Sequence, residues 1–224
     1  MTGLLSMLNP GWLLIAVGLG ALFLPVRRVR QGLTIAAPII AILLISVADR
    51  NVNLLTGHAL GIEMILYRVD NLSYIFGLAF LLAALLNAIY AWHTDDRLQD
   101  GMSIAYAGAA VAATFSGDMM TLFVFWELTA ITSVFLILRA GTRAAYFASM
   151  RYLGVQILSG VLLLAGIGYV YQSRGDLSIS AFTSLNEPGA LLVFIALGIK
   201  AAFPFLHNWL QDSCLLYTSP SPRD

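Results

Sequence analysis

Long apolar runs separated by short polar connections dominate the chain. An α-helix rises 1.5 Å per residue, so roughly 20 residues are needed to cross the hydrocarbon core of a bilayer, which is about 30 Å thick. The pattern therefore predicts an all-α fold, a polytopic bundle of about seven transmembrane helices. The expected helices cover residues 4–25, 32–48, 70–92, 101–116, 118–138, 146–171 and 189–210.

Two connections are longer than the rest, 49–69 and 172–188, but neither is long enough to form a soluble domain. The first apolar run is not typical of a cleaved signal peptide, because its arginines follow the apolar stretch instead of preceding it. We interpret it as a retained first helix.

Composition supports a multi-spanning membrane protein. Hydrophobic residues make up 59% of the chain and charged residues 11%, whereas a soluble domain is about 45–50% apolar. The net charge is zero, so no basic field favours nucleic acid, and nucleic-acid binding is not expected. Motifs for nucleotide binding, hydrolysis, haem or iron–sulfur clusters are absent from the sequence, so we expect no cofactor and no metal.

The last eleven residues, CLLYTSPSPRD, resemble one reading frame of a transposase sequencing adapter. We therefore interpret 214–224 as a non-native tail and 1–213 as the natural part, which we expect to be a fragment. The single cysteine, Cys214, lies in that tail. The natural part thus has no thiol for a disulfide or a metal site.

The distribution of arginines predicts the orientation in the membrane, because cytoplasmic loops carry an excess of positive charge. An N-terminus outside the cell places six arginines in the cytoplasm and three outside; the six are Arg27, Arg28, Arg30, Arg97, Arg139 and Arg143, and the three are Arg50, Arg68 and Arg174. We expect a multi-pass protein of the cell membrane, the bacterial inner membrane. The acidic group Asp95, Asp96 and Asp100 is expected to be a solvated turn.

Two charges of opposite sign lie inside apolar runs. Lys200, the only lysine, is eleven residues past Gly189, and Glu127 is nine residues past Asp118. These spacings put both near the membrane centre, about 16.5 Å and 13.5 Å along their helices, where a charge costs roughly 2.5–3.5 kcal/mol. Asp118 or Ser116 is expected to cap the helix that carries Glu127. We interpret Glu127 and Lys200 as a functional pair.

Such a pair suits proton transfer. Burial favours the neutral forms and mutual attraction favours the charged forms, so uniting or separating the two groups loads and releases protons. In this hypothesis Lys200 carries the proton, and the charge of Glu127 adjusts the proton affinity of Lys200. The alternatives are that Lys200 snorkels to water, and that Glu127 stays protonated or bonds to a hydroxyl of Thr129 or Thr132.

Pro204 follows Lys200 by four residues. Proline has no N–H, so the carbonyl of Lys200 loses its helical partner, and we expect the helix to kink or open at the lysine with water nearby. Interrupted helices of this kind mark binding sites in transporters. A proline kink without a functional role is the alternative.

Other polar residues predict packing more than chemistry. Arg68 and Asp70 are expected to form an interfacial anchor, and Arg151 to snorkel toward the cytoplasmic side. Asn87 and Gln156 lie in the middle of their helices and are expected to bond across helices.

Two segments carry a family resemblance. GDMMTLFVFWELTAITSVFLI, residues 117–137, and GIKAAFPFLHNWLQDS, residues 198–213, resemble the two charged signatures of the proton-translocating antiporter-like subunits. Within that family the second segment is most similar to the D-type subunits of multisubunit Mrp-type sodium/proton antiporters. Close relatives are the proton-pumping membrane subunits of NADH–quinone oxidoreductase and of membrane-bound hydrogenases.

The resemblance implies a larger fold and a set of site residues. Members have about fourteen helices, including inverted repeats that each contain an interrupted helix. Glu127 would be the fifth-helix glutamate, Lys200 the seventh-helix lysine and Pro204 the helix break, while His207 and Trp209 match the HxW positions. His207 is a secondary relay candidate, or else a helix-end histidine bonded to backbone.

The chain departs from the family pattern in two ways. Pro204 stands one residue closer to the lysine than in many relatives, and the second repeat is missing. We therefore expect 1–213 to be a truncated transmembrane antiporter-like domain, the N-terminal half of such a subunit, followed by the tail 214–224.

The resemblance implies a membrane subunit of a monovalent cation (Na⁺)/proton antiporter, a secondary transporter and not an enzyme. Its partners would be the other subunits of the complex, protons, Na⁺ and the lipid bilayer. The alternatives are a proton-pumping subunit of NADH–quinone oxidoreductase or of a membrane-bound hydrogenase, and a membrane scaffold that transports nothing. The choice of sodium follows from the resemblance alone.

Overall fold

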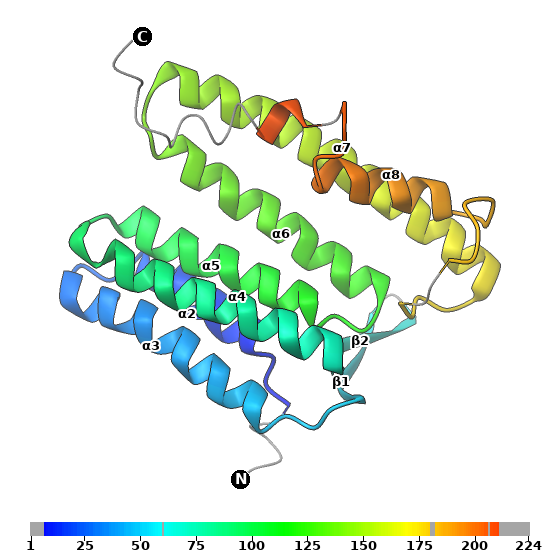
Figure 1. The fold of residues 1–224 in the computed structure, drawn as a ribbon, viewed down its shortest axis with the longest axis horizontal. Helices are drawn as coiled ribbons and strands as arrows, with labels where there is room; N and C mark the ends of the chain where they lie inside the picture. Colours follow the sequence, from blue (N-terminus) through cyan, green and yellow to red (C-terminus); the bar gives the residue numbers. More distant parts are fainter. Residues whose placement is uncertain (1–6, 60, 180–181, 206, 211–224) are drawn as a thin grey trace. The chain divides into compact units, whose positions relative to one another are not determined.

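The computed structural model describes residues 7–59, 61–179, 182–205 and 207–210. The chain divides into two compact units, Met1–Thr132 and Ser133–Asp224, whose elements can be followed by colour in Figure 1. The predicted non-native tail, 214–224, lies outside the described residues.

Each predicted apolar run contains a helix. The helices are α2 Pro10–Ala21, α3 Arg27–Ser46, α4 Asn71–Tyr90, the short 3₁₀ helix η1 Ala91–His93, α5 Arg97–Thr114, α6 Met119–Leu138, α7 Arg143–Arg174 and α8 Ala190–Lys200. Within the described residues, α3, α4 with η1, α6 and α7 are long and apolar enough to cross a membrane, while α2 and α8 are shorter apolar helices. The predicted all-α transmembrane class is confirmed.

The connection 49–69 contains a β-hairpin that the hydrophobic pattern did not predict. Its strands, β1 Val52–Ala59 and β2 Ile62–Val69, pair antiparallel. Tyr67 and Val69 of β2 are fully buried on one face of the strand, and the Tyr67 ring packs edge-on against Phe115 at 5.8 Å between centroids. Alternate burial is the period of a half-buried strand, and branched and aromatic residues suit it.

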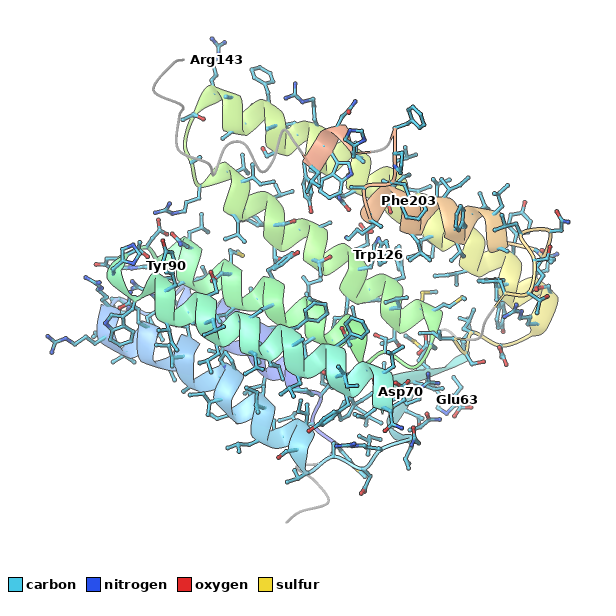
Figure 2. The ribbon with its side chains drawn as sticks, viewed as in Figure 1. Glu63, Asp70, Tyr90, Trp126, Arg143 and Phe203 are labelled. Atoms are coloured by element: carbon cyan, nitrogen blue, oxygen red, sulfur yellow. The ribbon has the colours of Figure 1, made fainter. Side chains whose placement is uncertain are left out.

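Polar side chains cap the helix starts in the first unit. Asn9 accepts a hydrogen bond from the amide of Gly11 before α2. Asp70 and Ser73 form a capping box before α4, and Figure 2 labels Asp70 and Tyr90 at the two ends of this helix. Asp70 also lies 3.6 Å from Arg68, and an interfacial anchor of these two residues stays a prediction. Such caps satisfy amides that the helix leaves without partners.

Helices α2 and α5 pack with their backbones in close contact. Gly11 and Gly18 of α2 face Gly108 and Gly101 of α5, and a Cβ added to Gly18 would lie 2.6 Å from the backbone nitrogen of Ala105. Real Cβ atoms do not approach backbone so closely, so only glycine fits. Small residues at helix crossings permit this kind of packing in membranes.

In the second unit α7 and α8 lie side by side, as Figure 1 shows. The loop between them turns at Gly175 and Gly189, both with positive φ. Gly166 of α7 leaves room for the backbone of Val193, and the hydroxyl of Ser159 donates to the Ala196 carbonyl at 2.9 Å. These contacts fix α8 along α7.

The α2–α5 contact generates a matched pair of variants. Gly18→Ala should destabilise the protein by about 1–3 kcal/mol, because overpacking forces the backbones apart. Gly20→Ala on the same helix should be neutral, because nothing lies within 4 Å of the added Cβ. Thermal unfolding in detergent measures both; equal melting temperatures for the two variants would contradict the contact.

Candidate functional site

The helix that carries Glu127 begins at a buried carboxylate. Asp118 is 1% exposed. Its two oxygens accept hydrogen bonds from the amide of Thr121 at 2.8 Å, the hydroxyl of Thr121 at 2.6 Å and the amide of Ile65 at 2.7 Å. Ser116 instead donates to the Ala112 carbonyl. Of the two predicted caps, Asp118 is therefore the one that caps α6.

The hairpin holds the segment just before α6. The amide of Gly117 donates to the Ile65 carbonyl, and the amide of Arg68 donates to the Phe115 carbonyl, both at 2.9 Å. A Cβ on Gly117 would lie 2.2 Å from Cγ2 of Ile65, so this close approach requires glycine. Strand β2 thus extends its hydrogen bonding onto the α5–α6 connection and fixes the position at which α6 starts.

Glu127 lies about two and a half turns into α6, next to Trp126, which Figure 2 labels on that helix. The hydroxyl of Thr129 donates to the Trp126 carbonyl at 2.7 Å, and that of Thr132 donates to the Leu128 carbonyl at 2.8 Å. A hydroxyl has one proton to donate. Both threonine hydroxyls therefore donate to carbonyls of their own helix.

Helix α8 ends at Lys200. The predicted opening of the helix at the lysine is confirmed, but a continuous helix over 189–210 is wrong: a separate helical turn occupies 208–210. Ala202 and Phe205, on either side of Pro204, adopt positive φ values of 54° and 71°. Proline cannot donate the next helical bond, so the chain leaves the helix.

The freed carbonyls at this end find partners from beyond the break. The amide of Phe203 donates to the Gly198 carbonyl at 2.9 Å, a pattern typical of helix C-termini. The indole nitrogen of Trp209 donates to the Ile199 carbonyl at 3.1 Å, and the indole packs on Tyr152 of α7 at 5.4 Å between centroids. Trp209 therefore holds the open end of α8 against α7.

The remaining predicted site residues are placed as follows. Glu127 belongs to the first unit and Lys200 to the second, so their pairing stays a prediction. His207 lies between the break and the last described turn, and its carbonyl accepts from the Leu210 amide at 2.9 Å. Its part in proton transfer is likewise a prediction.

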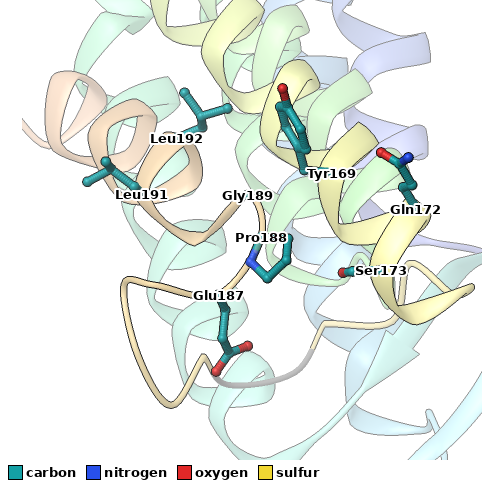
Figure 3. A pocket seen from close by; sticks show the side chains of 8 residues that line it. All are labelled: Tyr169, Gln172, Ser173, Glu187, Pro188, Gly189, Leu191 and Leu192. Carbon is teal, nitrogen blue, oxygen red and sulfur yellow. The ribbon is translucent and has the colours of Figure 1, made fainter.

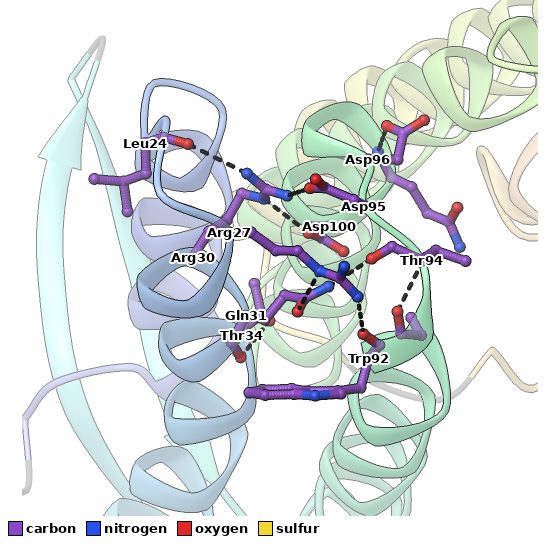
Figure 4. Close-up of polar contacts among 12 residues, drawn as sticks. Leu24, Arg27, Arg30, Gln31, Thr34, Trp92, Thr94, Asp95, Asp96 and Asp100 are labelled. Atoms are coloured by element: carbon purple, nitrogen blue, oxygen red, sulfur yellow. Dashed lines mark hydrogen bonds and ion pairs between the residues drawn. The ribbon is translucent and has the colours of Figure 1, made fainter.

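A charged cluster that the sequence analysis missed joins α3 to α5. Arg30 is 1% exposed, and its guanidinium donates to Asp100 at 2.8 Å and to Asp95 at 2.5 Å, as Figure 4 shows. Asp100 is also buried, so the expected solvated turn is wrong for this residue. The signal was available in the sequence: arginines at the start of one predicted helix and aspartates at the start of another.

Neighbouring side chains extend this cluster to the end of α4. The Arg27 guanidinium donates to the Trp92 carbonyl at 2.8 Å, and the side-chain amide of Gln31 donates to the Thr94 carbonyl at 2.6 Å. The first turn of α3 thus satisfies carbonyls at and beyond η1. The cluster closes one end of the first unit.

The buried ion pair generates a stability prediction. Asp100→Ala leaves the buried Arg30 guanidinium short of a counter-charge, which should cost about 3 kcal/mol. Arg28→Ala, at an exposed position two residues away, is the control and should be nearly neutral. Denaturant unfolding in micelles measures the difference; an Asp100→Ala protein as stable as the control would contradict a stabilising pair.

The α7–α8 loop contains a second ion pair beside a pocket. The Glu187 carboxylate accepts hydrogen bonds from the Arg174 guanidinium and from the backbone amide and the hydroxyl of Thr183, each at 2.6 Å. An open pocket of about 470 Å³ lies beside it (Figure 3), lined by Tyr169, Gln172, Ser173, Glu187, Pro188, Gly189, Leu191 and Leu192. The pocket includes none of the predicted relay residues.

The Glu187 contacts generate a pH prediction. The hydrogen bonds from Thr183, followed by the one from Arg174, lower the pKa of Glu187 to about 2, against about 4.3 in an unfolded chain. A lowered folded-state pKa contributes stability that is present above the unfolded value and is lost as the pH falls toward 2.

The wild type should therefore exceed Glu187→Gln in melting temperature by a constant margin above pH 5, and this margin should shrink below pH 4. Thermal scans of both proteins between pH 7 and pH 3 measure it. A margin that does not change with pH would count against the ionised contact.

Comparison with known proteins defines the class. Residues 116–221 match the family model described as NADH:quinone oxidoreductase/Mrp antiporter, transmembrane. This range contains the Asp118 cap, Glu127, Lys200 and Trp209. Residues 116–221 thus match the transmembrane domain of the antiporter-like membrane subunits, and the predicted resemblance is confirmed for this stretch.

Individual relatives sharpen the class. The chain is 26% identical over 164 residues to the D-type subunit of the Na(+)/H(+) antiporter of Bacillus subtilis, covering 66% of this chain and 33% of that protein. It is 35% identical over 107 residues to the N-type subunit of the NADH-quinone oxidoreductase of Desulforudis audaxviator, covering 44% and 21%. The chain is therefore a homologue of both the Mrp-type antiporter subunits and the quinone oxidoreductase subunits.

The fold is shared with a solved membrane complex. A chain of respiratory complex I from Thermus thermophilus with bound aureothin superimposes with a TM-score of 0.73 at 20% identity, covering 95% of this chain and 47% of that one. At this identity the likeness concerns the fold. The present chain spans about a third of the length of the Bacillus subtilis relative and just under half of this structural neighbour.

Proposed function

We propose that the chain is part of a membrane subunit that exchanges protons for a monovalent cation, Na⁺, within a multisubunit antiporter of the cell membrane. The observation that carries the proposal is the end of α8 at the chain's only lysine, inside a segment that matches the antiporter-like domain. The homologues are subunits of larger complexes, which supports other subunits as partners. The N-terminus lies outside in this proposal, as the arginine distribution indicates.

Lys200 carries the proton in this function. It occupies the last turn of α8, where carbonyl groups and the helix dipole favour a positive charge. A lysine ammonium has three donors and releases a proton when its surroundings change. Protons arriving from one side of the membrane load the lysine and leave it toward the other.

Glu127 is the counter-charge. Its helix starts at a position fixed by the Asp118 cap and the hairpin, so the carboxylate has a defined depth. Moving a carboxylate toward or away from an ammonium changes the proton affinity of both groups. This coupling links the two steps of the relay.

A second function, a proton-pumping subunit of an NADH–quinone oxidoreductase, is favoured by the 35% identity to the Desulforudis audaxviator relative. The proposed local chemistry is the same in the two cases, and the energy source differs. Proton movement driven by a sodium gradient indicates the antiporter, and proton movement driven by quinone reduction indicates the pump. A non-transporting scaffold would show neither.

The relay is tested in the full-length subunit, assembled in its complex in inverted vesicles. Glu127→Gln and Lys200→Ala should each reduce proton movement by about 10²-fold, the scale of a lost proton-transfer group. Lys200→Arg should fail as well, because arginine keeps the charge but does not release its proton.

Glu63→Gln on the hairpin, an exposed position, is the matched control for loss of a carboxylate and should transport normally. Wild-type transport by both Glu127→Gln and Lys200→Ala would overturn the relay. In wild-type vesicles a sodium gradient should drive more proton movement than quinone reduction does. More proton movement with quinone reduction would indicate the redox-driven pump instead.

A further inference from the structure

Gln156 is a buried amide without a hydrogen-bond partner among the described residues. It lies in the middle of α7 and is 1% exposed, and neither its Nε2 nor its Oε1 has a partner in the described part of the chain. A buried polar group left unsatisfied loses its bonds to water without replacement, and buried polar groups in native proteins are bonded to protein or to ordered water. The expected bond across helices is therefore not made to any described residue.

The neighbours of Gln156 on α7 show what it faces. Tyr152, one turn before it, packs on Trp209, and Ser159, one turn after it, donates to the Ala196 carbonyl. Residues three and four apart lie on one face of a helix. The Tyr152 hydroxyl also shares a hydrogen bond of 2.7 Å with the Ser133 hydroxyl of α6. Along α7, Gln156 lies between the Trp209 contact and the Ala196 contact, and so is level with the stretch of α8 between Ala196 and the helix end, within the second unit.

The opposing stretch is where the helix opens. The Ile199 carbonyl bonds to the Trp209 indole beyond the break, and α8 ends one residue later, at Lys200. Backbone that leaves its helix at membrane depth is tolerated where protein or water satisfies it. A buried water needs two to four polar partners, and an amide supplies both a donor and an acceptor.

We propose that Gln156 binds water at the open end of α8 and so positions that water beside Lys200. An amide does not titrate at physiological pH, so it orients water without keeping or supplying the proton itself. Gln156 is thus a positioning residue that acts through the water it holds. The water site is independent of the proposed transport function, whereas the positioning role rests on it.

Thiol labelling tests the water site directly. In the full-length subunit, with Cys214 replaced by serine where that residue is present, Gln156→Cys is compared with Leu163→Cys. Leu163 is equally buried, at 1% exposure, on the same face of α7. A thiol reacts as its thiolate, which requires water, so the small cationic reagent methanethiosulfonate ethylammonium should label the Gln156→Cys protein at least about tenfold faster than the Leu163→Cys protein. Equal labelling rates of the two variants would overturn the water site.

Transport tests the positioning role. Gln156→Met keeps the length but removes the donor and acceptor, and should lower proton movement in inverted vesicles about tenfold or more. Gln156→Asn keeps both groups and leaves room for water, and should retain most of the wild-type rate. Normal transport by Gln156→Met, or equal loss in the Met and Asn variants, would overturn the role.

Failure of this inference and failure of the relay are distinguishable. If Lys200→Ala stops transport while Gln156→Met transports normally, the relay stands and the positioning role fails. If Lys200→Ala transports normally, the relay and the positioning role both fail, and the labelling ratio alone decides the water site. Melting temperatures of the purified variants separate a transport defect from misfolding: a Gln156→Met protein that does not assemble leaves the Asn variant and the labelling ratio as the deciding results.

Discussion

The Asp118 carboxylate is the interaction on which the first half of the site depends. It satisfies the first turn of α6 and, through the Ile65 amide, ties that turn to the hairpin. Buried amides must be paired where water is scarce, so one carboxylate meets the needs of two elements at once. Because Glu127 is a fixed number of residues along the same helix, the cap also sets its depth.

Unpaired backbone groups must also be satisfied around Lys200, in the second half of the site, but there the partners come from a different source. Helix α8 does not end at a cap in its own sequence; Pro204 interrupts it, and Trp209 and Phe203 return to bond the carbonyls of Ile199 and Gly198. The two predicted relay residues thus lie in contrasting settings. Glu127 is in the interior of a continuous helix, and Lys200 is at an end whose partners come from the following segment.

The contrast also explains which features the sequence predicts. Helix positions and the Asp118 cap follow from local rules, namely run length and a capping residue at the start of a run. The hairpin and the Arg30–Asp100 pair depend on contacts between segments far apart in the chain. The periodicity of apolar residues describes single segments, so it does not predict such contacts. Pro204 predicted that α8 opens, but the local pattern did not contain the contacts of Trp209 with the Ile199 carbonyl and with Tyr152 on another helix.

Magnitudes indicate why the end of α8 needs more than its own dipole. A lysine charge near the bilayer centre costs roughly 2.5–3.5 kcal/mol, and a helix C-terminus returns about 0.3–1 kcal/mol. The difference has to come from a counter-charge, from water, or from both. In our proposals Glu127 supplies the first and the water on Gln156 the second. The proton affinity of Lys200 depends on the sum of these contributions, so a change in either one loads or releases the proton.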